Sequence, residues 1–146
     1  MITKEQFAGM TASESVEWET PLDFFTSLDA VFHFTLDVCA TPENAKCAQF
    51  FTLADDGLAQ PWQGACWMNP PYGRDIGKWM RIAYESAKAG ATVVCLVPAR
   101  TDTAWWHDYA AKGVVTFIRG RLRFNKHKWN APFPSAVCVF QPGAVA

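Results

Sequence analysis

Ala65-Cys66-Trp67-Met68-Asn69-Pro70-Pro71-Tyr72 is the most informative stretch of this sequence. Its first four residues predict a short buried strand, which the two prolines must end because proline lacks the N–H that strand pairing requires. The chain then leaves the sheet through a stiff Pro-Pro corner, which holds the Asn69 amide, the Pro70 carbonyl and the Tyr72 ring in fixed relation. This arrangement favours recognition of a flat group that carries an NH2. The alternative is an ordinary turn after a strand.

Apolar runs on both sides of this stretch predict further strands. Phe34–Ala40 is a short β-rich run with Asp37 toward its end, and Thr92–Val97 is an unbroken apolar run. The second run is typical of a strand covered on both faces of a parallel sheet. Ligands bind outside the carboxyl ends of strands in doubly wound sheets, so Asp37 and the loop at 98–103 are expected beside a crevice. The alternative for Asp37 is a solvated position at a strand end.

The first helix is expected just before this set of strands. Thr20 is placed to cap it, Pro21 suits its first position and Asp23 completes a capping-box pattern. We expect the helix to end near Ala30. An ordinary helix start is the alternative to a functional role for the Thr-Pro pair. The residues that form its apolar stripe are Phe24, Phe25, Leu28 and Val31.

Two more helices are expected between the later strands. One should follow the loop at 73–77 and run through Lys88, and a shorter one should span Ala104–Lys112, with Gly90 and Gly113 as their stops. The buried positions expected on the longer helix are Ile76, Trp79, Met80, Ala83 and Ala87.

The last third of the chain predicts an antiparallel pair of strands, Val115–Phe124 and Ala136–Phe140, with a basic loop at 126–130. Period-two alternation places three arginines on one face of the first strand. A solvated sheet face is the ordinary interpretation of such a row, and phosphate contacts beside an aromatic surface are the functional one. The two expected faces are Ile118, Leu122 and Phe124, and Phe117, Arg119, Arg121 and Arg123.

Composition predicts a single domain at 17–146 that follows a flexible N-terminal arm at 1–16. The 146 residues are 50% hydrophobic, with neither a signal peptide nor a run near the roughly 18–20 apolar residues of a membrane span, so we expect a cytoplasmic protein. A net charge of −1 argues against holding nucleic acid by bulk electrostatics alone. The five scattered cysteines contain no C-x-x-C pair, which argues against a metal site or a disulfide framework, and Cys66, Cys95 and Cys138 are expected to be small core residues because they fall in apolar strands.

The Asn-Pro-Pro-Tyr motif looks like the catalytic motif of amino-group methyltransferases that use S-adenosylmethionine. With the rest of the chain included, the sequence resembles small phage-type DNA N6-adenine methyltransferases from about Trp18 to Phe140. Each matching stretch is weak alone, and their joint order is specific. These stretches are Trp18–Pro21, Leu36–Ala40, Asn44–Cys47, Asp56–Leu58, Asn69–Gly73, Pro98–Thr103 and Gly120–Phe124.

The resemblance implies an α/β fold: an abbreviated Rossmann-like methyltransferase domain, with a mostly parallel sheet and a C-terminal antiparallel hairpin. One departure from the wider superfamily stands out. Most members follow the cofactor strand with a Gly-x-Gly turn that lets the backbone approach the cofactor, whereas 38–44 contains no glycine.

The resemblance also implies roles for individual residues. Asn44 is assigned to a ribose hydroxyl or, equally, to a local turn, and Asp56 is preferred to Asp55 as the partner of the cofactor's adenine. Arg100 and Asp102 are candidates for the substrate face, with a local ion pair and a helix cap as the alternative. The catalytic set is Asn69, Pro70, Pro71 and Tyr72, and the cofactor set is Thr20, Pro21, Asp37, Cys39, Ala40, Asn44 and Asp56. The nucleic-acid set is Arg74, Arg100, Arg119, Arg121, Arg123, Lys126 and Lys128.

The implied reaction is direct methyl transfer to the exocyclic nitrogen of adenine in DNA, with S-adenosylmethionine as cofactor and no metal. Asn69 and the Pro70 carbonyl would each accept an N–H, and Tyr72 would stack on a flipped base. Pairing of two copies would add contact area on DNA. The alternatives are a methyltransferase for RNA adenine or protein glutamine, and a non-catalytic nucleic-acid-binding module. A phage gene would place the protein in the cytoplasm of a bacterial host.

Overall fold

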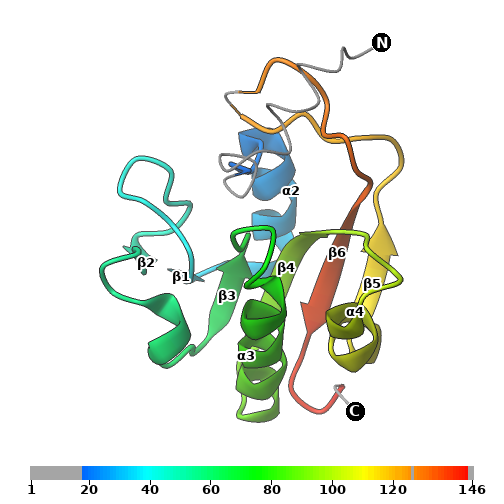
Figure 1. Ribbon diagram of the computed structural model, residues 1–146. Helices are drawn as coiled ribbons and strands as arrows, with labels where there is room; N and C mark the ends of the chain where they lie inside the picture. The colour runs from blue at the N-terminus through cyan, green and yellow to red at the C-terminus, as the bar shows by residue number, and fades with distance from the viewer. Residues whose placement is uncertain (1–17, 126, 145–146) are drawn as a thin grey trace.

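Figure 1 shows a computed structural model of the chain, in which residues 18–125 and 127–144 are described. The predicted arm at 1–16 and the predicted DNA contact Lys126 lie outside the described residues. Six strands form one sheet in the order β2-β1-β3-β4-β6-β5. They are β1 (Leu36–Asp37), β2 (Gln49–Phe50), β3 (Ala65–Met68), β4 (Thr92–Pro98), β5 (Val114–Phe117) and β6 (Ser135–Phe140).

The first four strands are parallel, and β6 runs antiparallel to both β4 and β5. This topology confirms a mixed α/β domain whose mostly parallel sheet ends in an antiparallel hairpin. The finer expectation of an abbreviated Rossmann-like fold stays a prediction. Because β1, β3 and β4 are parallel, their carboxyl ends meet at one edge of the sheet, where Figure 1 also shows the start of α2 and the long connection before β6.

Helices cover both faces of the sheet. In Figure 1, α3 (Ile76–Lys88) and α4 (Ala104–Asp108) lie in front of it and α2 (Leu22–Phe32) lies behind. The expected helix at 104–112 is divided, because Tyr109 leaves helical geometry at φ −127° and a separate 3-10 turn forms at Ala110–Lys112. The predicted buried face of α3 is confirmed at all five positions, and Tyr84 is buried with them.

The core lies between these layers. The four residues of the predicted strand Ala65–Met68 form β3, and β4 is buried along nearly its whole length, as its apolar run predicts. On the α2 side, the Phe25 ring packs edge-on against Trp67 with the ring centroids 5.3 Å apart. Trp62 is also a core residue, as predicted, and its indole N–H donates to the Gly57 carbonyl at 2.8 Å.

The predicted apolar stripe of α2 is partly wrong. Phe25 is the buried residue of this helix, whereas Val31 is 69% exposed. The strands β1 and β2, at one side of the sheet, have only two residues each, so they offer little surface for a helix to cover. The predicted capping box is also wrong: the cap residue is Pro21, which makes no side-chain cap bond, and Asp23 Oδ1 instead accepts the adjacent Phe24 N–H at 2.8 Å.

The predicted strand Val115–Phe124 is too long. β5 ends at Phe117, and Ile118 makes the next bond, from its N–H to the Ser135 carbonyl at 3.0 Å. Gly120 then takes a left-handed φ of 77°, which extended backbone cannot contain. Although 118–124 is not a strand, the prediction of which side chains face inward and outward is correct here, since Phe124 is buried and Arg119, Arg121 and Arg123 are exposed.

Gly57 lets the chain make a close approach behind the end of β1. A Cβ atom at this position would lie 2.4 Å from the main-chain oxygen of Val38 and 3.1 Å from the Trp79 ring. A glycine is therefore required beside the residues that follow β1. It lies in a later segment than 38–44, where most members of the superfamily carry the Gly-x-Gly turn.

Gly57→Ala is expected to lower the free energy of unfolding by about 1–3 kcal/mol, the usual cost of overpacking against atoms that cannot move aside. Gly77→Ala is the matched control, because its Cβ would lie 3.4 Å from the Trp105 Cβ and alanine favours the helix. Urea unfolding of both variants checks the expectation. Equal midpoints for the two variants would contradict it.

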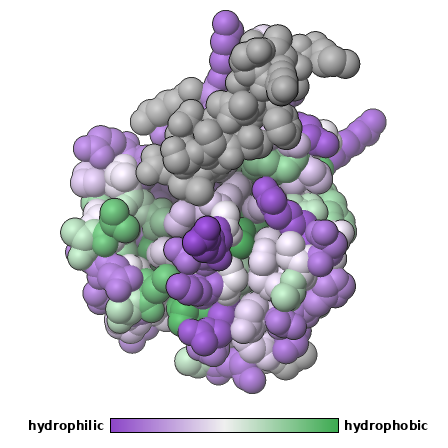
Figure 2. All heavy atoms as spheres, in the orientation of Figure 1, coloured by the Kyte–Doolittle hydropathy of each residue, from purple (hydrophilic) through white to green (hydrophobic). Residues whose placement is uncertain are grey.

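The visible surface is mainly hydrophilic. Figure 2 shows hydrophobic residues as separate patches between hydrophilic ones on the face that it draws. Among the described residues, no helix has both the length and the apolar character needed to cross a membrane.

Candidate active site

The Asn69 side chain lies directly after β3 and is held by the segment Trp18–Thr20. Its Nδ2 donates to the Trp18 main-chain carbonyl and to Thr20 Oγ1, the latter at 3.0 Å. A carbonyl oxygen can only accept, so the nitrogen must face Trp18 and the orientation of the carboxamide is fixed. Oδ1 is then buried without a hydrogen-bond partner. Leaving a buried acceptor unsatisfied costs about 1–3 kcal/mol, so this oxygen needs a donor that the described residues do not supply.

A second buried oxygen without a partner, Ser135 Oγ, lies at the same edge of the sheet. Ser135 starts β6 and is paired with Pro98 at the end of β4. Because β6 is antiparallel, its first residue meets the carboxyl ends of the parallel strands. The unsatisfied polar atoms among the described residues therefore gather at the edge where ligands bind in such sheets.

The Pro-Pro corner positions Tyr72 deep in the molecule. Pro70 is fully buried, and the Tyr72 hydroxyl donates to the Leu96 carbonyl at 3.0 Å. Burial raises the pKa of Tyr72 well above its usual range. The ring packs edge-on against Phe133 at 5.6 Å and Phe124 at 6.3 Å. Stacking of Tyr72 on a base stays a prediction, and it requires a neighbouring ring to move.

Asp37 ends β1 and is 2% exposed. Its Oδ1 accepts the Cys39 N–H at 3.3 Å and its Oδ2 accepts the Lys46 N–H at 3.0 Å. Burial raises the pKa of Asp37 from 3.8 to about 6, even though both hydrogen bonds lower it. The carboxylate closes the turn that lacks glycine, and it keeps capacity for a cationic donor because each oxygen has a second lone pair.

The remaining cofactor candidates lie on the turns beyond β1 and β2. Asn44 Oδ1 accepts the Thr41 N–H at 2.7 Å, which confirms the local-turn interpretation and leaves the ribose contact as a prediction. Asp55 is used locally, since its carboxylate accepts from the Thr52 N–H and hydroxyl, while Asp56 is exposed. Cys39 is half-buried and Ala40 is buried.

Trp18–Thr20, which we call the strap, connects the two ends of this site. Thr20 is 2% exposed and contacts Asn69, as described above. On the other side, Glu19 Oε1 lies 4.0 Å from Lys46 Nζ, and the Lys46 N–H binds Asp37. Thr20 of the predicted Thr-Pro pair therefore contacts Asn69 through its hydroxyl, while the neighbouring Glu19 is linked to Asp37 only through Lys46.

Two parts of this site have no recognisable signal in the sequence. Trp18 binds Asn69 through its main-chain carbonyl, a group that every residue carries. Asn125 binds through its main-chain N–H and its side-chain amide, which any surface asparagine also carries. Asn125 donates from its main-chain N–H to the Glu19 carbonyl at 3.0 Å and from Nδ2 to the Thr20 carbonyl at 3.1 Å.

The predicted nucleic-acid residues are exposed wherever the structure describes them. Arg121 and Arg123 donate to main-chain carbonyls of their own loop, Ala131 at 3.5 Å and His127 at 3.3 Å. The ion pair offered as an alternative for Arg100 and Asp102 does not form, and Thr103 caps α4 in place of Asp102. The other exposed members of the set are Arg74, Arg119 and Lys128.

A groove of about 470 Å³ lies next to the strap and is lined by two of these arginines, Arg121 and Arg123. It lies between the start of α2 and the loop after β5. Its lining residues are Pro21, Asp23, Phe24, Ser27, Arg121, Leu122, Arg123 and Asn130.

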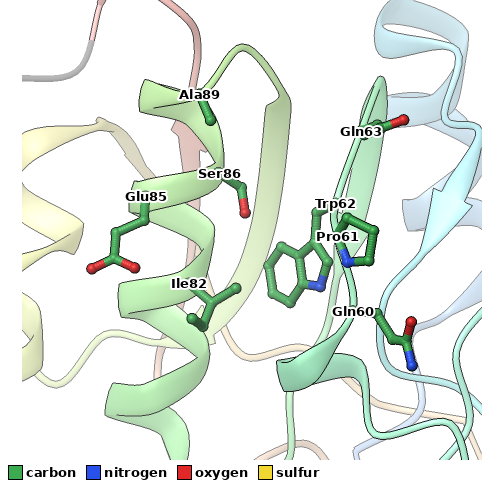
Figure 3. A pocket seen from close by; sticks show the side chains of 8 residues that line it. All are labelled: Gln60, Pro61, Trp62, Gln63, Ile82, Glu85, Ser86 and Ala89. Atoms are coloured by element: carbon green, nitrogen blue, oxygen red, sulfur yellow. The ribbon is translucent and has the colours of Figure 1, made fainter.

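A second cavity, of about 330 Å³, lies between α3 and the residues that precede β3, at the opposite edge of the sheet (Figure 3). The Trp62 indole points toward α3 in this view, and no predicted site residue lines the cavity. It is therefore separate from the candidate active site.

The described cysteines are free thiols, and Cys66, Cys95 and Cys138 are buried as predicted. Burial raises the pKa of Cys66 to about 11 and that of Cys138 to about 12, so these thiols are unreactive core residues. Within 18–125 and 127–144, no three His, Cys, Asp or Glu side chains are grouped closely enough to hold a metal ion.

A mixed α/β fold with an Asn-Pro-Pro-Tyr corner after a parallel strand is consistent with a methyltransferase-like protein. The chain belongs to the DNA N-6-adenine-methyltransferase (Dam) family, whose model matches residues 9–139. That match begins inside the segment expected to be a flexible arm.

Two relatives agree with this assignment. The chain is 31% identical over 137 residues to the DNA N-6-adenine-methyltransferase of Haemophilus phage HP1 (strain HP1c1), covering 87% of this chain and 79% of the relative. It is also 38% identical over 64 residues to the putative methyltransferase YfdM of Escherichia coli (strain K12), covering 38% of this chain and 70% of that protein.

Proposed function

We propose that this chain is a DNA methyltransferase that transfers a methyl group from S-adenosylmethionine to N6 of adenine. The family assignment supports the reaction class. The observation that carries the proposal at the level of residues is the buried Asn69 Oδ1, an acceptor without a partner directly before Pro70. An adenine amino group carries two N–H donors, and two neighbouring carbonyl oxygens match them.

The residues described above fit the cofactor. Asp37 is a buried carboxylate able to accept a charged N–H, and an ammonium group there would stabilise its ionised form. When bound, S-adenosylmethionine supplies an electrophilic methyl group on a sulfonium. Asp37 would hold its ammonium group, Asp56 would accept from its adenine, and Pro21 would contact its methionine end.

Asn69 and Pro70 would act on the target nitrogen. The adenine amino group is a poor nucleophile because its lone pair is delocalised into the ring. Acceptance of one N–H by Asn69 Oδ1 and of the other by the Pro70 carbonyl favours a pyramidal nitrogen with its lone pair directed at the methyl group. The bond from nitrogen to the methyl carbon would form as the carbon–sulfur bond breaks, leaving a neutral thioether; the methylated nitrogen would then lose one proton to water, and no bond to the protein forms. Orientation of this kind is worth on the order of 7–11 kcal/mol.

Base access requires a rearrangement of both partners. A target adenine in duplex DNA must be flipped out, at a cost of a few kcal/mol. Asn69 Oδ1 is buried and the Tyr72 ring is 4% exposed, so the strap or the loop after β5 must move to admit a base. Pairing of two copies on DNA stays a prediction.

The deciding experiment is incubation with methyl-labelled S-adenosylmethionine and unmodified DNA, followed by nucleoside mass analysis. N6-methyladenine in DNA is the expected product. RNA and protein are parallel acceptors, and a product on either of them alone overturns the DNA assignment. Failure to bind the cofactor in calorimetry would favour a non-catalytic nucleic-acid-binding module.

Arg121→Ala is expected to weaken DNA binding across sequences and to lower the slope of log affinity against log salt by about 1, as loss of one phosphate contact requires. Arg81→Ala is the matched control, because it removes the same charge from the exposed side of α3. Fluorescence anisotropy at several salt concentrations measures both quantities. A slope that stays equal to that of the wild type excludes Arg121 as a phosphate contact.

A further inference from the structure

We propose that Asn125 is a positioning residue for methyl transfer, which acts through Thr20 on the carboxamide of Asn69. The kinetic part of this proposal rests on the proposed function. The structural part concerns only how the Asn69 side chain is oriented and is independent of the acceptor.

Asn125 donates hydrogen bonds to two successive residues of the strap. Its main-chain N–H binds the Glu19 carbonyl at 3.0 Å and its side-chain Nδ2 binds the Thr20 carbonyl at 3.1 Å. These two bonds fix the peptide planes on both sides of the Thr20 Cα. The position of the Thr20 side chain is thereby set from the loop after β5.

The strap is also held by ring packing. Trp18 stacks on the His127 ring, with centroids 4.3 Å apart and an interplanar angle of 14°, and packs edge-on against Phe133 at 5.1 Å. Ring packing of this kind holds Trp18 against the loop without directing any polar atom. The hydrogen bonds of Asn125 supply that direction.

The strap then orients the catalytic amide. Both acceptors of Asn69 Nδ2, the Trp18 carbonyl and Thr20 Oγ1, belong to it. The last torsion of an asparagine side chain has a broad, roughly two-fold preference, so the side chain alone does not select which end carries oxygen. With the strap fixed, Nδ2 is held and Oδ1 must point to the side where a substrate N–H would arrive.

Asn125→Asp tests the proposal because it keeps the shape and removes the side-chain donor. We expect kcat to fall about tenfold or more, since misplacement of a reacting group by about 1 Å can cost a factor near 100. The dissociation constant of S-adenosylmethionine and the unfolding midpoint should change little. If Asn125 had only a structural role, its substitution would lower the unfolding midpoint and would not lower kcat selectively while cofactor affinity stays the same.

Thr20 variants test whether Asn125 acts on Asn69 through the Thr20 hydroxyl. Thr20→Val removes the hydroxyl with little change of shape and should lower kcat to a similar extent, whereas Thr20→Ser restores the hydroxyl and should recover activity to within about threefold. In the double variant Asn125→Asp with Thr20→Val, kcat should be no lower than in the slower single variant. Multiplied losses would contradict an action of Asn125 through the Thr20 hydroxyl.

A second measurement does not depend on turnover. The side-chain NH2 protons of Asn69, identified in ¹⁵N spectra by their absence in Asn69→Ala, should exchange slowly in the wild type and faster in Asn125→Asp. Gln141→Ala, at an exposed position after β6, is the control and should change neither exchange nor kcat.

Each outcome has a defined meaning. Unchanged exchange in Asn125→Asp overturns the proposal, and so does faster exchange with an unchanged kcat. If the wild-type protein makes no N6-methyladenine, the proposed function fails, and the exchange measurement alone decides whether Asn125 orients Asn69.

Discussion

Asn69→Ala is expected to lower kcat for DNA methylation at least about 100-fold while the dissociation constant of S-adenosylmethionine stays within about threefold. The substitution removes the unpartnered oxygen that we assign to the adenine N–H. Loss of one preorganised polar contact to the reacting group in other enzymes costs about 100- to 1,000-fold. It also removes the Nδ2 hydrogen bonds to the strap. The free-energy barrier to methyl transfer and the position of the strap are therefore expected to change together.

Single-turnover kinetics and calorimetry separate these effects. Calorimetry reports whether the cofactor site is intact, and single-turnover rates report the chemical step alone. Gln141→Ala again serves as the control. Methylation at the wild-type rate in Asn69→Ala would refute the assignment of Asn69 as a catalytic residue.

Asp37→Asn is expected to raise the dissociation constant of S-adenosylmethionine about 10- to 100-fold, because hydrogen bonds to a charged group contribute about 1.5–3 kcal/mol. In the wild type, affinity should also fall as pH decreases below about 6, since the cofactor's ammonium needs the ionised carboxylate. The variant should show no such dependence in this range. Calorimetry from pH 5 to pH 8 measures both. A wild-type affinity that stays constant across that range excludes Asp37 as the ammonium partner.

Asp37 should also make the free protein less stable as pH rises. Its folded pKa, about 6, is above its usual 3.8, so the folded state binds more protons than the unfolded state between these values. Stability from this group is therefore complete below about pH 4 and is lost as pH rises through 6, a total of about 3 kcal/mol. The difference in unfolding free energy between wild type and Asp37→Asn should change by that amount between pH 4 and pH 8. A constant difference would contradict the burial of a charged carboxylate.

These two positions have a common energetic feature. At the same edge of the sheet, Asn69 keeps a buried oxygen without a hydrogen-bond partner, and Asp37 keeps a carboxyl group whose pKa is raised by burial. A ligand with an ammonium group and a ligand with an amino group would each supply the missing donors. Under the proposed function, binding of cofactor and base would recover the stability given up at this edge.

The sequence by itself determined the parts of the fold that depend on neighbouring residues. Two prolines end β3 at Met68, the apolar spacing of α3 identifies its buried face, and the unbroken apolar run of β4 identifies a central strand. The pairing of the last two strands also followed from their patterns, although Gly120 shortened the first of them. The motif Asn69–Tyr72 and the order of its neighbours indicated the family.

The tertiary structure alone decided how the site is held. Asn69 binds Thr20 across 49 residues and Asn125 binds Thr20 across 105 residues, and single polar contacts at such separations leave no periodic signal in a sequence. The pKa of Asp37 likewise depends on what buries it, which its position at a strand end does not specify. Local patterns record the repeat of a helix or a strand, whereas the direction of the Asn69 oxygen is set where three distant segments meet.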